Sequence, residues 1–228
     1  HGGGPQIDQA MKVSGLQPRF AQGLRITDAD TMRIVERVLV GEINQEIVAS
    51  IHRLGGAAIG LSGKDGGLIQ ARKAPPARTP DGQMVDLGLV GEVVRVEPRP
   101  IRALQDAGYI PVVAPTAGDE QGATLNINAD LVAGEVAAAL VAEKLVLLTD
   151  TDGILDRQGR LLSTLSRGDV DRLIADGTIS RGMLPKVQAC LTALSAGVQK
   201  THIINGTRQH ALIEELLTPE GVGTEIVA

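Results

Sequence analysis

The sequence predicts an α/β protein built in three layers, with helices on both faces of a mainly parallel β-sheet. Helical and strand periodicities alternate along most of the chain, which is typical of βαβ units. The core must be aliphatic, because the 228 residues include one Phe, one Tyr and no Trp, and aliphatic strands are typical of sheets buried on both faces. Three predicted strands end in polar, glycine-containing segments, where ligands bind in such sheets.

The N-terminal part of the chain is predicted to be mostly helical. A short helix follows the opening glycines at 5–15. The next helix, 27–40, has Thr27 or Asp28 as its N-cap and an apolar stripe with i, i+3, i+4 spacing. A third helix, 43–56, ends at glycine. The length of the whole chain fits one large α/β domain or two small ones.

From residue 57 onward, strands and helices alternate. The proline-rich stretch 72–84 is predicted to be an exposed loop or hairpin, because Pro and Gly interrupt regular structure. Residues 101–115 form a helix followed by a buried strand. The other predicted strands are 57–61, 88–96, 144–150, 201–206 and 224–227, and the other predicted helices are 129–142, 168–177, 182–197 and 209–217.

Charge and cysteine content narrow the class of protein. The formal net charge is −5, and no basic stripe or run of stacking aromatics is present, so the sequence does not favour a nucleic-acid partner. Cys190 is the single cysteine, which rules out an internal disulfide and indicates a reducing, cytoplasmic location. Its place in an apolar helix predicts a core residue. No apolar run is long enough to span a bilayer, so we expect no membrane partner.

The chain opens with "HGGGPQID", and three chemical interpretations are open for it. A glycine-rich loop before a helix can present backbone N–H groups to an anion, but a tight turn explains the glycines equally well. Neither a Rossmann fingerprint nor a Walker A motif is present. "HGGG" also occurs in the oxyanion loop of esterases, yet the nucleophile elbow G-x-S-x-G is missing, and the nearest piece is "GLSGK" at 60–64.

A third interpretation uses polar residues near other strand ends. Asn126, Asn128 and Asp130 lie between a loop and a helix, "TDTDGIL" follows a buried strand, and Lys186 lies near a helix start. Lysine, carboxylates and glycine loops without metal-ligand clusters suit phosphoryl transfer, in which the protein positions two anions and neutralises spreading charge. The four histidines lack zinc-site spacing, so we expect no protein-bound metal. Taken singly, each residue also has an ordinary structural explanation, such as a cap or a solvated lysine.

Together, these residues resemble the N-acetylglutamate kinases of the amino acid kinase superfamily. The matching segments run in family order over nearly the whole chain: "HGGGPQID", "GLRIT", "GYIPVVAP", "NINADLVAGEVAAAL", "LVLLTDTDGIL", "GMLPKVQA" and "HIING…HALIEELLTPEGVGTEI". The resemblance implies an αβα sandwich, the amino acid kinase fold, with one continuous sheet. It also implies that 1–128 holds the acyl amino acid and 129–228 holds the nucleotide. The implied reaction transfers the γ-phosphoryl group of ATP, with Mg²⁺ bound through the ATP, to the side-chain carboxylate of N-acetyl-L-glutamate, the second step of arginine biosynthesis.

The resemblance assigns roles to single residues. Substrate binding falls to Gly3, Gly4, Arg25 and Asn126, with Arg25 on the α-carboxylate. Lys186 would stabilise the transferring phosphoryl group, and Asp130 would organise the catalytic lysines. The implied ATP-binding residues are Asp150, Thr151, Asp152, Gly153, Ile154, Leu155, Thr178, Ile179 and Ser180.

One departure from the family pattern concerns the start of the chain. Family members begin with a strand carrying a Lys-x-Gly-Gly turn, then a helix and a second strand, and none of these precedes "HGGG" here. The expectation is therefore an N-terminally incomplete chain with an exposed sheet edge and little kinase activity by itself. Two alternatives stay open, a kinase similar to glutamate 5-kinase and a catalytically impaired regulatory fragment.

The C-terminal segment carries a second resemblance. His202, Glu215 and Gly221 resemble the arginine-inhibitor site of the feedback-sensitive branch of these kinases, which implies L-arginine as a further partner. The alternative is a plain strand end and a turn. The family also implies a homo-oligomer, either a dimer or, where arginine inhibits, a hexamer.

Overall fold

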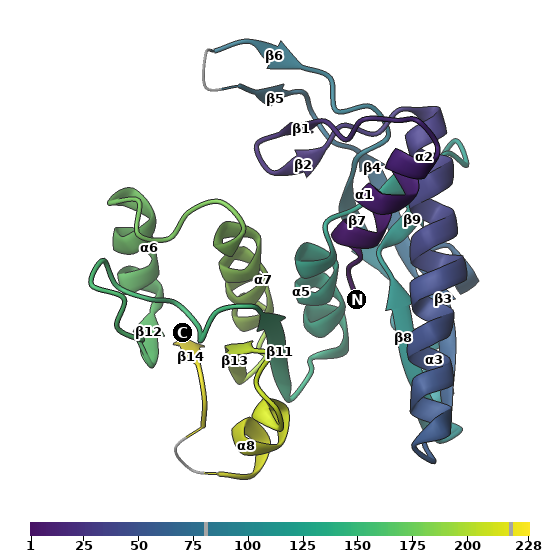
Figure 1. Ribbon diagram of the computed structural model, residues 1–228. Helices are drawn as coiled ribbons and strands as arrows, with labels where there is room; N and C mark the ends of the chain where they lie inside the picture. Colours follow the sequence, from purple (N-terminus) through teal and green to yellow (C-terminus); the bar gives the residue numbers. More distant parts are fainter. Residues whose placement is uncertain (80–81, 219–220) are drawn as a thin grey trace. The chain divides into compact units, whose positions relative to one another are not determined.

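The computed structural model describes residues 1–79, 82–218 and 221–228, which divide into two units, His1–Val132 and Ala133–Ala228 (Figure 1). The boundary falls inside helix α5 (Ala129–Leu140). Each unit combines parallel strand pairs with packed helices, so the predicted α/β class is confirmed. The division of binding roles after residue 128 stays a prediction.

A long helix dominates the first unit. Helix α2 (Ala29–Glu36) continues through a π-helical segment η1 (Arg37–Ile43) into α3 (Asn44–Arg53), and Figure 1 shows them as one ribbon. The N-cap is Asp28, one of the two caps that the sequence predicts. Its carboxylate accepts a hydrogen bond from the Thr31 amide at 2.8 Å. The prediction of two separate helices is wrong, because the buried face continues through the π-turn.

The strands of the first unit form several small ladders. β3 (Ala58–Ser62) and β8 (Ile110–Ala114) pair in parallel, and α3 packs against both. The order of the four-stranded sheet is β10-β9-β4-β7, and two further hairpins are β1-β2 and β5-β6. The other elements of this unit are α1 (Gly4–Val13), β1 (Phe20–Ala21), β2 (Leu24–Arg25), η2 (Asp65–Gly67), β4 (Ile69–Lys73), β5 (Ala77–Arg78), β6 (Met84–Val85), β7 (Gly91–Val96), α4 (Arg99–Asp106), β9 (Thr116–Gly118) and β10 (Thr124–Asn126).

Several of these short strands were not predicted from the sequence. β1, β2, β4, β9 and β10 pair mostly as antiparallel neighbours, and all have five residues or fewer. Such segments are too short for a clear apolar alternation. The hairpin predicted within 72–84 is confirmed as β5-β6, although its residues 80 and 81 lie outside the described residues.

In the part of the second unit that the structure describes, one mixed sheet packs with three helices that lie wholly within the unit. The strand order is β11-β13-β14-β12, in which β13-β14 is antiparallel and the other two pairs are parallel. Helix α7 packs on the sheet and buries Cys190 completely, as predicted. The elements are β11 (Lys144–Thr149), β12 (Thr164–Ser166), α6 (Arg167–Ala175), α7 (Met183–Ser195), β13 (Lys200–Asn205), α8 (Ala211–Leu217) and β14 (Thr224–Val227).

Every ladder between described strands lies within one unit, so one continuous sheet through both halves stays a prediction. Among the described helices, none has the length and apolar character needed to cross a membrane.

Candidate functional site

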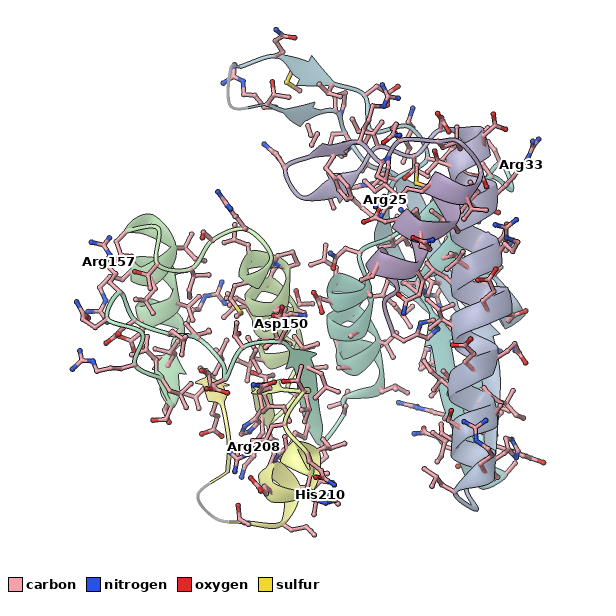
Figure 2. The ribbon with its side chains drawn as sticks, viewed as in Figure 1. Arg25, Arg33, Asp150, Arg157, Arg208 and His210 are labelled. Atoms are coloured by element: carbon pink, nitrogen blue, oxygen red, sulfur yellow. The ribbon has the colours of Figure 1, made fainter. Side chains whose placement is uncertain are left out.

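Arg25 lies almost fully buried at the end of β2, against helix α1. Its Nη1 donates to Asp8 Oδ1 at 2.6 Å, and its Nη2 lies 3.4 Å from the Gly4 carbonyl. The guanidinium also lies over the Phe20 ring, 4.7 Å from the centroid. A planar guanidinium held on several sides is pre-oriented for a second carboxylate, since it has five N–H donors in a fixed fork. Figure 2 shows Arg25 beside α1.

The glycines of "HGGG" lead into α1, and each has a different reason for being glycine. A Cβ on Gly3 would collide with the side chains of Ile43 and Leu39, so packing from the long helix requires glycine there. A Cβ on Gly4 would meet nothing within 4 Å, so the other side of the loop is open. The first amides of a helix lack partners within the helix, and the helix dipole favours an anion beside them. This part of the chain could therefore bind a negatively charged group.

Asn126 is linked to Arg25 through Thr27, which the sequence indicated only as a possible N-cap. The Asn126 side-chain amide donates to Thr27 Oγ1 at 3.3 Å, and the Thr27 hydroxyl donates to the Arg25 carbonyl at 2.8 Å. Thr27 is completely buried. The structure thus joins two of the predicted substrate-binding residues, 101 positions apart in sequence, in one hydrogen-bond network.

Asp130 owes its position to Asn128, which caps α5. The Asn128 side-chain oxygen accepts from the Asp130 and Leu131 amides at 2.9 and 3.1 Å. This cap places the Asp130 carboxylate in the first turn of α5. A Cβ on Gly2 would lie 3.7 Å from Ala129, so "HGGG" runs close to the same helix start.

In the second unit, the segment 150–155 follows β11 directly. Asp150, Thr151 and Asp152 are exposed, and the Asn205 amide donates to Asp152 Oδ1 at 2.8 Å. Gly153 has a φ of 137°, and a Cβ there would lie 2.7 Å from Thr224 Oγ1 and 2.8 Å from Leu161. The close approach that requires glycine is therefore to Thr224 of the protein's own β14.

The two predicted nucleotide segments meet through their apolar residues. Ile154 and Ile179 are both 2% exposed and belong to one hydrophobic cluster. These two side chains are therefore core, and the neighbouring polar groups of Thr178 and Ser180 are the ones left for a ligand. Burial of the two isoleucines is what brings the segments together.

Lys186, half-buried in the first turns of α7, reaches the end of β11. Its Nζ lies 3.4 Å from the Leu148 carbonyl, two residues before Asp150. The predicted phosphoryl-stabilising lysine and the predicted nucleotide segment are thus neighbours in the same unit. An ammonium group at this strand end is suited to a phosphate group.

A metal bound by protein side chains alone does not fit this site. Over residues 1–79, 82–218 and 221–228, no group of three or more His, Cys, Asp or Glu side chains is placed to hold a metal ion. Mg²⁺ keeps several waters and is commonly held by substrate phosphates with one or two carboxylates. The exposed carboxylates of Asp150 and Asp152, which follow the strand end that Lys186 reaches, fit that mode of binding.

His202, Glu215 and Gly221 also come together. Glu215 is 4% exposed, and its Oε1 lies 2.7 Å from His202 Nδ1 and 3.0 Å from Lys144 Nζ. The Val222 amide donates to its Oε2 at 2.9 Å, while a Cβ on Gly221, whose φ is 60°, would crowd the same oxygen. Burial lowers the pKa of His202, although the Glu215 carboxylate opposes this shift.

These three residues line a cavity of about 260 Å³. The sequence analysis missed its other charged residues, Lys144, Lys200 and Glu225. Register explains their presence, because Lys144 pairs with Lys200 and His202 pairs with Glu225 across neighbouring strands. A cavity with both carboxylates and cations on its walls suits a small zwitterion or a ligand with both charges.

The comparisons with known proteins agree with this fold. The profile of the amino acid kinase family matches residues 1–205. The chain belongs to the amino acid kinase family, and its family and relatives indicate a kinase, that is, a phosphotransferase.

The names of curated relatives specify one kinase within this family. The chain is 52% identical over 229 residues to an acetylglutamate kinase of Bordetella avium (strain 197N), covering 100% of this chain and 76% of that protein. The N-acetylglutamate synthase from Neisseria gonorrhoeae in complex with coenzyme A and N-acetyl-glutamate has a TM-score of 0.84 at 28% identity, over 100% of this chain and 51% of that one. The same synthase in complex with coenzyme A and L-arginine has a TM-score of 0.74 at 25% identity, over 100% of this chain and 52% of that one.

Proposed function

We propose that this protein is an acetylglutamate kinase, which phosphorylates the side-chain carboxylate of N-acetyl-L-glutamate with MgATP. The observation that carries the proposal is the 52% identity, across the whole chain, to a kinase of that name. The fold alone would not decide it, because a synthase shares the fold. In the reaction, a carboxylate oxygen bonds to the γ-phosphorus and the bond to ADP breaks, giving N-acetylglutamyl 5-phosphate.

The first unit supplies the proposed substrate side. Arg25 binds the α-carboxylate through its remaining N–H groups, and Asn126 orients the bound amino acid. Amides of Gly3 and Gly4 donate to the anion that forms as the phosphoryl group transfers, because Gly4 leaves that face of the loop open. The Arg25–Thr27–Asn126 network supports this assignment, since it joins two substrate contacts rigidly.

The second unit supplies the proposed nucleotide side. The exposed groups of 150–153 and of Thr178 and Ser180 contact ATP, and Lys186 neutralises charge on the phosphate. Asp130 belongs to the first unit, at the start of α5, and we assign it the role that the family resemblance implies, which is to organise the catalytic lysines. ATP supplies the γ-phosphoryl group, and its phosphates carry the Mg²⁺.

The test is a phosphoryl-transfer assay on the full-length protein with MgATP and hydroxylamine, which traps acyl phosphates. We expect N-acetyl-L-glutamate to react and free L-glutamate to react at least a hundredfold more slowly. A preference for free glutamate would favour the glutamate 5-kinase alternative. A protein whose melting temperature rises with neither ATP nor N-acetyl-L-glutamate would favour the regulatory alternative, since a ligand that binds the native state stabilises it.

We further propose that L-arginine binds in the cavity of His202, Glu215 and Gly221 and inhibits the enzyme. The buried Glu215 carboxylate and the mixed charges of the walls suit a ligand with both a carboxylate and cationic groups. The related synthase has been crystallised with L-arginine. Arginine titrated into the full-length kinase should lower its rate, and no inhibition at millimolar concentration would reject the idea.

Assembly and location are part of the same proposal. We expect a cytoplasmic homo-oligomer, a dimer or, with arginine inhibition, a hexamer. Light scattering on the full-length protein measures the assembly, and a monomer at micromolar concentration would contradict it.

A further inference from the structure

A buried asparagine lies where the π-helical segment η1 meets α3. Asn44 is 1% exposed, although asparagine is usually a surface residue. Burying an amide is costly unless it is hydrogen-bonded. π-Helical turns are rare and are frequently found at functional sites, so the partners of Asn44 are of interest.

The Asn44 side chain joins the β3-β8 ladder to the "HGGG" segment. Its Nδ2 donates to the Val112 carbonyl at 2.8 Å and also lies 3.2 Å from His1 Nε2. Because this amide nitrogen is donating, the His1 Nε2 must accept. The other ring nitrogen, Nδ1, lies 3.0 Å from the Gly2 carbonyl, which is an acceptor. The contacts therefore fix His1 as the neutral tautomer protonated on Nδ1.

The neighbours of Asn44 hold the next part of the same segment. Leu39 and Ile43, on η1, press against Gly3 so closely that no Cβ fits there. The long helix also lies close to β3, where the Asn44 side-chain oxygen is so near Gly60 that a Cβ is excluded there too. Glycine at position 60 thus lets the long helix approach β3, and the helix in turn fixes residues 1–3.

From this geometry we infer that Asn44 is a positioning residue for phosphoryl transfer. It holds the His1 ring, the ring holds the Gly2 carbonyl, and the orientation of that peptide sets where the Gly3 and Gly4 amides point. The inference rests on the proposed function of those amides. Donors to a forming anion must be oriented before the reaction, because reorienting them during it costs catalytic rate.

The first test reads the tautomer without any substrate. Long-range ¹H–¹⁵N spectra of the full-length protein distinguish the two neutral imidazole forms, and a His1→Gln variant identifies the His1 signals. We expect the Nδ1-protonated form in the native protein. Asn44→Asp keeps the shape but turns the donor into an acceptor, so the proton should move to Nε2 or the ring should become charged. An Nε2-protonated His1 in the native protein, or no change in Asn44→Asp, would overturn the inference.

The second test is a double-mutant cycle on the kinase reaction. Asn44→Leu and His1→Leu should each lower kcat by about tenfold or more with little change in the KM of ATP, and the double variant should be no worse than either. His1→Gln, which keeps an acceptor, should recover part of the rate. Additive losses in the double variant would show that Asn44 does not act through His1.

A control separates positioning from lost stability. Ser166→Ala removes the N-cap of α6 and so lowers stability without touching this segment. Its kcat should stay within twofold. If the protein shows no activity on N-acetyl-L-glutamate, the proposed function fails while the tautomer test still decides the Asn44–His1 contact. If it is an active kinase with additive losses, only the positioning inference fails.

Discussion

The guanidinium of Arg25 lies 2.6 Å from the Asp8 carboxylate, and the same guanidinium reaches the Gly4 carbonyl at the start of α1. One side chain therefore connects the β1-β2 hairpin to the proposed anion-binding loop. Asp8 remains 38% exposed, so the ion pair is buried on the arginine side and open to solvent on the other. The proposed substrate carboxylate would bind guanidinium N–H groups that Asp8 does not occupy.

Substituting Arg25 by lysine should raise the KM for N-acetyl-L-glutamate by about tenfold or more, while the KM for ATP changes little. Lysine keeps the charge, but a single ammonium group cannot hold Asp8 and a substrate carboxylate in two separate directions. Steady-state kinetics with each substrate varied in turn would measure both constants.

The matched control is Arg33→Lys. Arg33 lies on α2, pairs with Asp30 by a largely exposed contact and points outward (Figure 2). Its kinetic constants should not change, because exposed ion pairs contribute little. Equal effects of the two substitutions would mean that the loss in Arg25→Lys is not specific to the site.

Sequence patterns identified candidate site residues but not the contacts that connect them. Arg25, Asn126 and Lys186 stand out by type and by resemblance to a family. Thr27 joins two of them through buried hydrogen bonds, and nothing in its local sequence predicts that role. Such contacts depend on the register of distant strands and on packing. The apolar periodicity of the sequence, 2.0 residues in strands and 3.6 in helices, does not encode either of them.

The long helix shows the same limit in the fold itself. Gly41 lies between two helical patterns, so a break was a reasonable expectation. The structure keeps the helix whole by a π-turn, because Val38, Leu39 and Ile43 are buried on a continuous face. Tertiary packing thus overrides the low helix propensity of glycine.

Gly153→Ala should lower the free energy of unfolding by about 2 kcal/mol, because the backbone conformation is strained for alanine and the new methyl group would press on Thr224. It should also raise the KM for ATP, since the neighbouring polar groups would shift. Chemical denaturation and ATP titrations measure the two effects.

Gly159→Ala is the comparison, since its φ of 78° is also positive but a Cβ there meets nothing within 4 Å. It should cost about 1 kcal/mol from backbone strain alone. A larger loss for Gly159→Ala than for Gly153→Ala would contradict the packing argument.

The buried His202 should make stability depend on pH just below neutrality. Burial lowers the pKa of His202, while Lys144 competes for the Glu215 carboxylate that would otherwise favour the charged ring. As pH falls from 7.5 through the ordinary histidine pKa of about 6.5, the unfolded chain gains this proton before the folded protein does. The free energy of unfolding therefore falls with pH in this window.

Urea denaturation at pH 7.5 and pH 5.5 would measure the effect. His202→Gln removes the ionisable group, so its stability should decline less between the two values than that of the native protein. Equal declines in the two proteins would show that His202 is not held neutral.

Loss of the Glu215 carboxylate should be severe. Glu215→Ala leaves Lys144 and His202 on the wall of the cavity without the buried carboxylate that they share. Removing one partner of a buried charged pair typically costs about 3–5 kcal/mol. As a comparison, Arg208→Ala breaks a more exposed ion pair with Glu214, the neighbour of Glu215 on α8. It should lower the free energy of unfolding by less than about 1 kcal/mol. Denaturation curves that rank the two variants the other way would contradict the structural role of Glu215.

Lys186→Ala should lower kcat by about a hundredfold or more with a smaller change in the KM for N-acetyl-L-glutamate. The Lys186 ammonium reaches the strand end that precedes Asp150, and a cation there stabilises charge that spreads over the phosphoryl group during transfer. Lys186→Arg keeps the charge at a different distance, so it should recover only part of the rate.

Lys12→Ala, at an exposed position of α1, is the control and should leave the rate unchanged. Because Lys186 is only half-buried, the alanine variant should unfold at nearly the native denaturant concentration. A kcat within threefold of the native value in that folded variant would remove Lys186 from the proposed catalytic site.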